Sequence, residues 1–74
     1  MHFKERLREL RLDSGLTQAK LAEKLSVTDT TIRHWEAGRS QPSIQLLVIL
    51  SDLFDVTLDY LVGKTNSLPL SEPK

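Results

Sequence analysis

Cysteine is absent from the 74 residues, so the chain can form no disulfide, thiolate metal site or cysteine nucleophile. Histidine occurs only at His2 and His34, which are too few for a credible metal or nucleophilic site. No apolar run approaches the roughly 20 residues of a membrane span, and the first residues do not resemble a secretory signal. We therefore expect a cytoplasmic protein that binds no membrane, metal, cofactor or small-molecule ligand.

An excess of either charge is also lacking, because ten Lys and Arg balance ten Asp and Glu. The distribution is uneven, however. Residues 1–45 carry eight basic against six acidic side chains, and residues 46–74 carry two against four. The first part is therefore mildly basic. This is compatible with an anionic partner such as a nucleic acid, whose phosphates bind Lys and Arg, but does not require one.

Glycine and proline number three each, and most of them interrupt patterns typical of helices. Phe3, Leu7 and Leu10 have the spacing of an amphipathic helix that ends near Gly15. Further helices are predicted over 18–25, 29–37, 44–54 and 58–62. Each of these begins just after a hydroxyl residue suited to an N-cap, namely Thr17, Thr28, Ser43 or Thr57. The prediction is an all-α, compact five-helix domain over 1–63, followed by a short flexible tail over 64–74.

Three segments carry a resemblance to a known family: LTQAKLAEKL at 16–25, WEAGR at 35–39 and VTLDYLVG at 56–63. Together with Val27-Thr28, Ile32 and Pro42-Ser43, they resemble the Cro and lambda-repressor-like (XRE-type) helix-turn-helix regulators of bacteria and phages. The resemblance covers about residues 3–63. It implies that the partner is double-stranded operator DNA, that helix 29–37 lies in the major groove, and that the protein is nucleoid-associated.

Helix 29–37 is expected to bury one face and present the other to DNA. Ile32 and Trp35 share one side, whereas Thr30, Arg33 and His34 lie opposite. An Arg fork suits guanine O6 and N7, and Asp29 either accepts from cytosine N4 or favours the helix N-terminus through the dipole. The residues expected to contact bases are Asp29, Thr30, Arg33 and His34.

The resemblance assigns three further roles. Phosphate contacts are implied for Thr17, Gln18 and Arg39, with Arg8 and Lys20 as further candidates. An internal ion pair is implied for Arg11 and Glu36. Ser26 stands where relatives usually have the glycine of a turn that needs positive φ, at a cost of about 1 kcal/mol.

Helix 44–54 is more apolar than one buried face requires. Ile44, Leu47, Val48, Ser51 and Phe54 match the core positions of the family. Leu46, Ile49 and Leu53 form a second apolar stripe on a different side of the helix. A small domain is not expected to leave such a stripe exposed to water. Two explanations remain open: a homodimer interface that pairs two recognition helices, or a monomer whose tail covers the stripe through Leu68 and Leu70.

The sequence therefore predicts a sequence-specific DNA-binding transcriptional regulator, expected to be a repressor. A protein-interaction module, such as an antitoxin or a bridging coactivator, is the alternative. No catalytic residues are expected, because the chain has no Gly-rich phosphate loop, paired carboxylates in a pocket-like context or activated nucleophile. The chain is thus not expected to be an enzyme.

Overall fold

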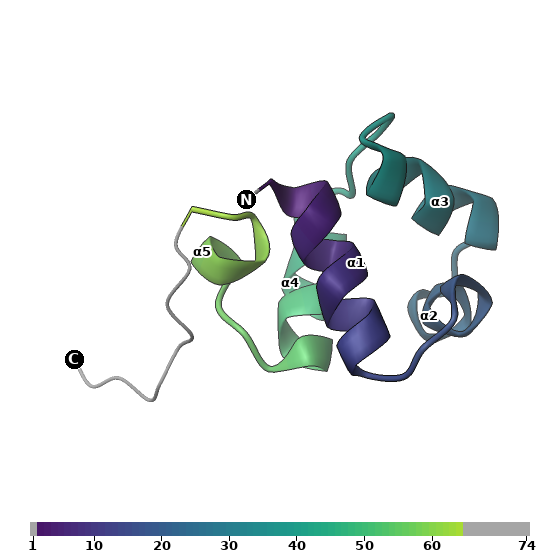
Figure 1. Cartoon of the computed structure of the whole chain (residues 1–74), viewed down its shortest axis with the longest axis horizontal. Coiled ribbons are helices and arrows are strands. Elements are labelled where there is room, and N and C mark those ends of the chain that lie inside the picture. Colours follow the sequence, from purple (N-terminus) through teal and green to yellow (C-terminus); the bar gives the residue numbers. More distant parts are fainter. Residues whose placement is uncertain (1, 65–74) are drawn as a thin grey trace.

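The computed structural model describes residues 2–64. Over this range the chain forms five helices and no strand, as the sequence predicts (Figure 1). The helices are α1 (Phe3–Asp13), α2 (Gln18–Leu25), α3 (Asp29–Ala37), α4 (Ile44–Phe54) and α5 (Leu58–Leu61). Apart from Lys64, the predicted tail lies outside the described residues, and so do Leu68 and Leu70. No helix in the described range is long and apolar enough to cross a membrane.

The predicted hydroxyl caps determine where four of the helices begin. Thr17, Thr28, Ser43 and Thr57 each accept a hydrogen bond from the backbone N–H three residues later, over 3.0 to 3.2 Å. Each bond satisfies one of the N–H groups that a helix N-terminus leaves without an intrahelical partner. The starts of α2, α3, α4 and α5 are therefore fixed locally, by the residue types at these positions.

The core is built from one buried face of every helix. Figure 1 shows α1 crossing in front of α4, with α2 and α3 to one side and α5 to the other. Because each fully buried leucine contributes about 1.5–3 kcal/mol, this small cluster holds the five helices together. Its members are Leu7, Leu21, Ala22, Leu25, Ile32, Trp35, Leu50 and Leu61.

The packing of α4 differs from the prediction. Ile44 is 78% exposed and Val48 is 42% exposed, so the assignment of these two residues to the core is wrong. The side that faces the core is centred on Leu50, which is fully buried, and Leu46 is partly buried against the core. With 100° per residue, a core centred on Leu50 turns the Ile44–Val48 side towards solvent.

A buried cation joins α1 to α5. The Arg6 side chain is 2% exposed, and its Nη1 donates to the carbonyl oxygen of Tyr60 over 3.1 Å. The guanidinium also lies 3.8 Å from the centroid of the Tyr60 ring, an arrangement typical of a cation–π contact. A polar contact thus helps to hold the short helix α5, whose four residues could not form a stable helix alone.

Candidate nucleic-acid interface

Helices α2 and α3 are joined by only three residues, Ser26 to Thr28. Figure 1 shows α2 nearly end-on and α3 lengthwise, so the two helices cross steeply. Ser26 has φ 60°, which confirms the positive φ expected at this position. Its N–H donates to the Glu23 carbonyl, and the Val27 N–H donates to the Ala22 carbonyl. These two bonds form a Schellman motif, which ends α2 and turns the chain into α3.

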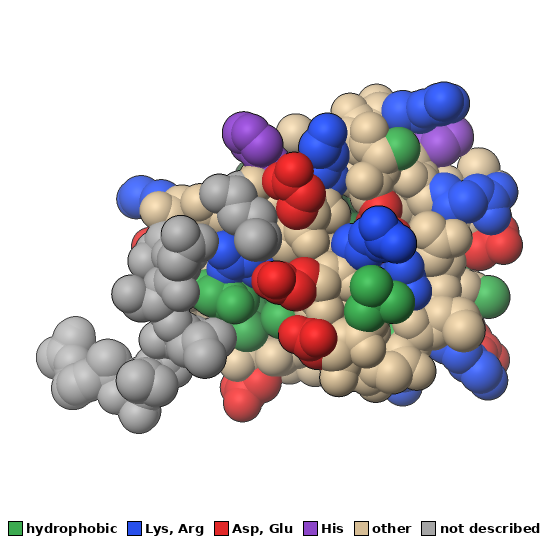
Figure 2. Space-filling view, viewed as in Figure 1, with side chains coloured by type: hydrophobic (Ala, Val, Ile, Leu, Met, Phe, Trp, Pro, Cys, Tyr) green, Lys and Arg blue, Asp and Glu red, His purple; other side chains and the backbone are tan. Residues whose placement is uncertain are grey.

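The two faces of α3 divide as the periodicity predicts. Ile32 and Trp35 are buried in the core, at 0% and 3% exposure. Thr30, Arg33 and His34 are exposed on the opposite side. Figure 2 shows several Lys, Arg and His side chains around the end of the molecule that α2 and α3 form. The outer face of α3 is therefore free to meet a partner.

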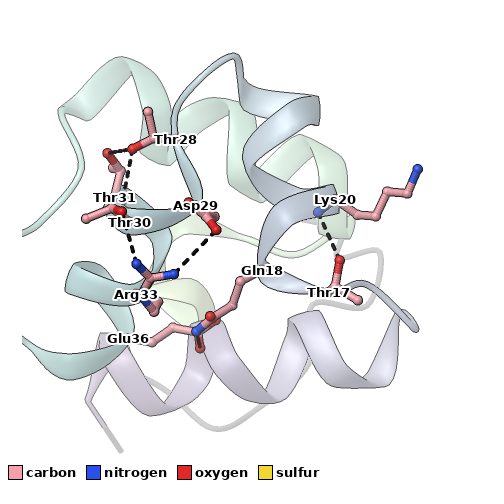
Figure 3. Close-up of polar contacts among 9 residues, drawn as sticks. All are labelled: Thr17, Gln18, Lys20, Thr28, Asp29, Thr30, Thr31, Arg33 and Glu36. Carbon is pink, nitrogen blue, oxygen red and sulfur yellow. Dashed lines mark hydrogen bonds and ion pairs between the residues drawn. The ribbon is translucent and has the colours of Figure 1, made fainter.

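Arg33 is held by two neighbours on its own helix (Figure 3). Its Nη1 donates to Asp29 Oδ2 over 3.4 Å, and its Nη2 donates to Thr30 Oγ1 over 3.0 Å. The sequence predicts these three residues at the interface, but not their contacts with one another. The signal was present, because an acid four residues before an arginine is a favourable helical pair.

A polar cluster that is almost fully buried connects α1, α2 and α3. Arg11 Nε lies 2.6 Å from Glu36 Oε2, Arg11 Nη2 donates to Glu36 Oε1, and the two side chains are 8% and 6% exposed. Arg11 Nη1 also donates to the carbonyl of Leu16, in the turn before α2. The structure thus brings the two residues of the implied ion pair into contact, and they fix α1 against α3 and the turn.

Gln18 belongs to the same cluster. Its side-chain Nε2 donates to Glu36 Oε1 over 3.1 Å, so α2 is also attached to α3 at this point. One N–H of that amide remains for another acceptor. The hydroxyl of Thr17 accepts from the Lys20 N–H as a cap, which leaves its own O–H available. Within the described range, the backbone N–H of Gln18 has no hydrogen-bond acceptor.

An open groove of about 650 Å³ lies beside this cluster; we call it the basic groove. Arg8 and Arg39, which line it, form no ion pair with any residue of the described range 2–64. The predicted phosphate contact Arg39 and the further candidate Arg8 therefore line one surface with Arg33 and His34. The lining residues are Arg8, Arg11, Gln18, Arg33, His34, Glu36, Ala37 and Arg39.

Comparison with known families matches residues 7–61 to the helix-turn-helix family model. The chain belongs to the helix-turn-helix family. This helix-turn-helix protein is 40% identical over 72 residues to the transcriptional activator BcrR of Enterococcus faecalis, covering 97% of this chain and 35% of BcrR. It is 31% identical over 64 residues to RstR, a transcriptional repressor of the cryptic phage CTXphi from Vibrio cholerae, covering 86% of this chain and 57% of RstR.

Among solved structures, the helix-turn-helix protein is similar to the P22 c2 repressor crystallised with a synthetic operator. The TM-score is 0.81 at 28% identity, and the match covers 88% of this chain and 98% of that one. The chain thus spans only a third to rather more than half of the length of the two curated relatives, but almost all of the P22 c2 repressor chain in that structure. The likeness over α1 to α5 bears out the lambda-repressor-like fold.

Proposed function

We propose that this helix-turn-helix protein is a transcriptional regulator that binds double-stranded DNA in a sequence-specific manner, and that it acts as a repressor. The observation that carries the proposal is the outer face of α3, where exposed Thr30, Arg33 and His34 stand beside the basic groove. A helix with such a face fits the major groove, while cations at its side meet the phosphates. The P22 c2 repressor, similar over nearly its whole chain, was crystallised with operator DNA.

Base contacts are assigned to the outer face of α3. The Arg33 guanidinium has the fork that matches guanine O6 and N7. The Thr30 hydroxyl bonds a base edge or its methyl packs on thymine, and the His34 imidazole donates to guanine N7. Asp29 lies at the exposed start of the helix, where it accepts from cytosine N4 or acts on its own helix.

Phosphate contacts are assigned to Thr17, Gln18 and Arg39. The first two supply the free hydroxyl, amide and backbone N–H groups at the start of α2, an arrangement suited to a phosphate oxygen. Arg39, which follows α3, adds a positive charge to the lining of the basic groove, and Arg8 adds another from α1. The backbone of the DNA would therefore cross the groove from α2 to the loop after α3.

We also propose a homodimer. Ile49 and Leu53 are 47% and 38% exposed on α4, next to the partly buried Leu46, and such an apolar face in a small domain favours association. A twofold pair would present two α3 helices to half-sites about one helical turn of DNA apart. The same exposed face supports the second candidate function, a protein-interaction module in which α4 binds a different protein.

A titration distinguishes these functions. Fluorescent duplex DNA from the promoter region of the gene is titrated with the protein at two salt concentrations, with shuffled duplex as competitor. We expect binding that resists the competitor and weakens with salt, because log K falls with log salt by about 0.9 per phosphate neutralised. Equal affinity for both duplexes with a shallow salt slope would contradict the DNA-binding proposal at this site and favour the protein-interaction module.

A further inference from the structure

One base-reading candidate on α3 is held in place before any DNA is bound. Among the residues described, the Arg33 guanidinium donates to both Asp29 and Thr30, whereas the imidazole of the neighbouring His34 has no hydrogen bond. Asp29 and Arg33 lie four residues apart, so their side chains share one face of the helix (Figure 3). Both are about half exposed, at 51% and 52%, on the side that the proposed function turns to DNA.

We propose that Asp29 is a positioning residue: its carboxylate orients the guanidinium of Arg33 towards guanine, and Asp29 itself reads no base. This inference rests on the proposed function, since it concerns how the α3 face distinguishes DNA sequences. One carboxylate oxygen, Oδ2, already accepts from Arg33, and this contact favours the positioning role over acceptance from cytosine N4.

The donors of Arg33 are sufficient for both tasks. A guanidinium has five N–H groups, and the contacts to Asp29 and Thr30 engage one on each terminal nitrogen. Three remain, whereas a bidentate contact with guanine O6 and N7 needs only two. The pairing with Asp29 and Thr30 therefore restrains the fork without exhausting it.

The carboxylate also keeps Arg33 from the DNA backbone. A flexible arginine near DNA is attracted to any phosphate, and such contacts carry no sequence information. Asp29 offsets this attraction, since its negative charge is repelled by phosphates and attracts the guanidinium. Restraining the side chain beforehand also reduces the entropy lost on binding, an effect of about 3- to 10-fold in affinity for one long side chain.

The test is selection from a randomised duplex DNA library, followed by sequencing, with the wild-type protein, Asp29→Ala, Arg33→Ala and the double variant. We expect Arg33→Ala to abolish a guanine preference at one position. Asp29→Ala should weaken the preference at that same position about 3- to 10-fold, and the double variant should match Arg33→Ala. Asp29→Ala should also bind shuffled duplex as tightly as wild type or more tightly, because a negative charge has been removed.

Glu23→Ala is the matched control. Glu23 forms an exposed pair with Lys20 on α2, so this change also removes one carboxylate from an exposed helical ion pair. It should leave every base preference unchanged. Asp29→Asn keeps an oxygen acceptor for Arg33 and should retain part of the guanine preference.

Three results would overturn the inference. A change of preference at a different base pair, persisting in the Arg33→Ala background, would make Asp29 a base-reading residue. An unchanged preference at all positions would make the Asp29–Arg33 pair a surface ion pair without a role in recognition. If the wild-type protein enriched no sequence at all, the proposed function itself would be contradicted, and the positioning role with it.

Thermal unfolding of each variant verifies that the fold is intact.

Discussion

At the scale of single residues, the most informative feature is the left-handed backbone at Ser26. A residue with a Cβ pays roughly 1 kcal/mol for such a φ, whereas glycine adopts it freely. We expect Ser26→Gly to raise the free energy of unfolding by up to about 0.6 kcal/mol, after the extra entropy of glycine in the unfolded chain, about 0.4–1 kcal/mol, is subtracted. For a domain of this size, that corresponds to a midpoint higher by up to about 5 °C, measured by thermal unfolding with circular dichroism.

A β-branched residue at the same position provides the opposite control. Ser26→Val should destabilise the fold, because a β-branched side chain at positive φ is a true outlier. Lower stability of Ser26→Gly than of wild type would show that the serine side chain, and not its backbone, matters in this turn.

Helix starts could be predicted at single residues where one side chain determines the local structure. The four hydroxyl caps could be placed from sequence because each acts on the N–H three residues later. The left-handed end of α4 at Asp55, with φ 56°, was not foreseen. Its Schellman bonds, from the Asp55 and Val56 N–H groups, are the same as those at Ser26, but aspartate is a weaker signal for this conformation than glycine.

At the scale of helices, α3 could be oriented from sequence and α4 could not. The two large apolar residues of α3, Ile32 and Trp35, leave a single solution for its buried face. Helix α4 has apolar side chains on nearly all sides, so its periodicity does not specify which side packs inward. Its rotation is set instead by contacts with the other helices, which bury Leu50 and expose Ile44.

The exposed side of α4 leads to a prediction about assembly. If two copies pair through this face, replacing Ile49 and Leu53 by serine removes apolar area from both sides of a self-complementary interface. We expect light scattering after gel filtration to give twice the 8.4 kDa chain mass for wild type and about 8.4 kDa for the double variant, with unchanged helicity. Leu12→Ser is the matched control, since Leu12 is 54% exposed on α1. A wild-type protein of 8.4 kDa would contradict the dimer, and a variant that stays dimeric would place the interface elsewhere.

At the scale of the whole molecule, the site depends on contacts between residues far apart in sequence. Spacing along a helix suggests which side chains share a face, but the bond from Gln18 to Glu36 joins residues 18 positions apart on different helices. Nothing in the periodicity of either helix indicates it. The Arg11–Glu36 pair was expected only through the family resemblance, for the same reason.

The cluster of Arg11, Gln18 and Glu36 should affect stability chiefly when one partner is removed, because a buried charge then loses its counter-charge. Glu36→Ala leaves the buried Arg11 without its carboxylate, and we expect the free energy of unfolding to fall by about 3 kcal/mol. Replacing both partners, as Arg11→Met with Glu36→Leu, should cost less than Glu36→Ala alone, because no buried charge then remains. Urea unfolding measures the loss in free energy of unfolding for both variants. As a control, Glu23→Ala removes one partner of an exposed pair and should lower this free energy by less than about 1 kcal/mol. If Glu36→Ala lowered the free energy of unfolding no more than Glu23→Ala does, water would have to replace the lost carboxylate. The apolar core alone would then hold α1 and α3 together.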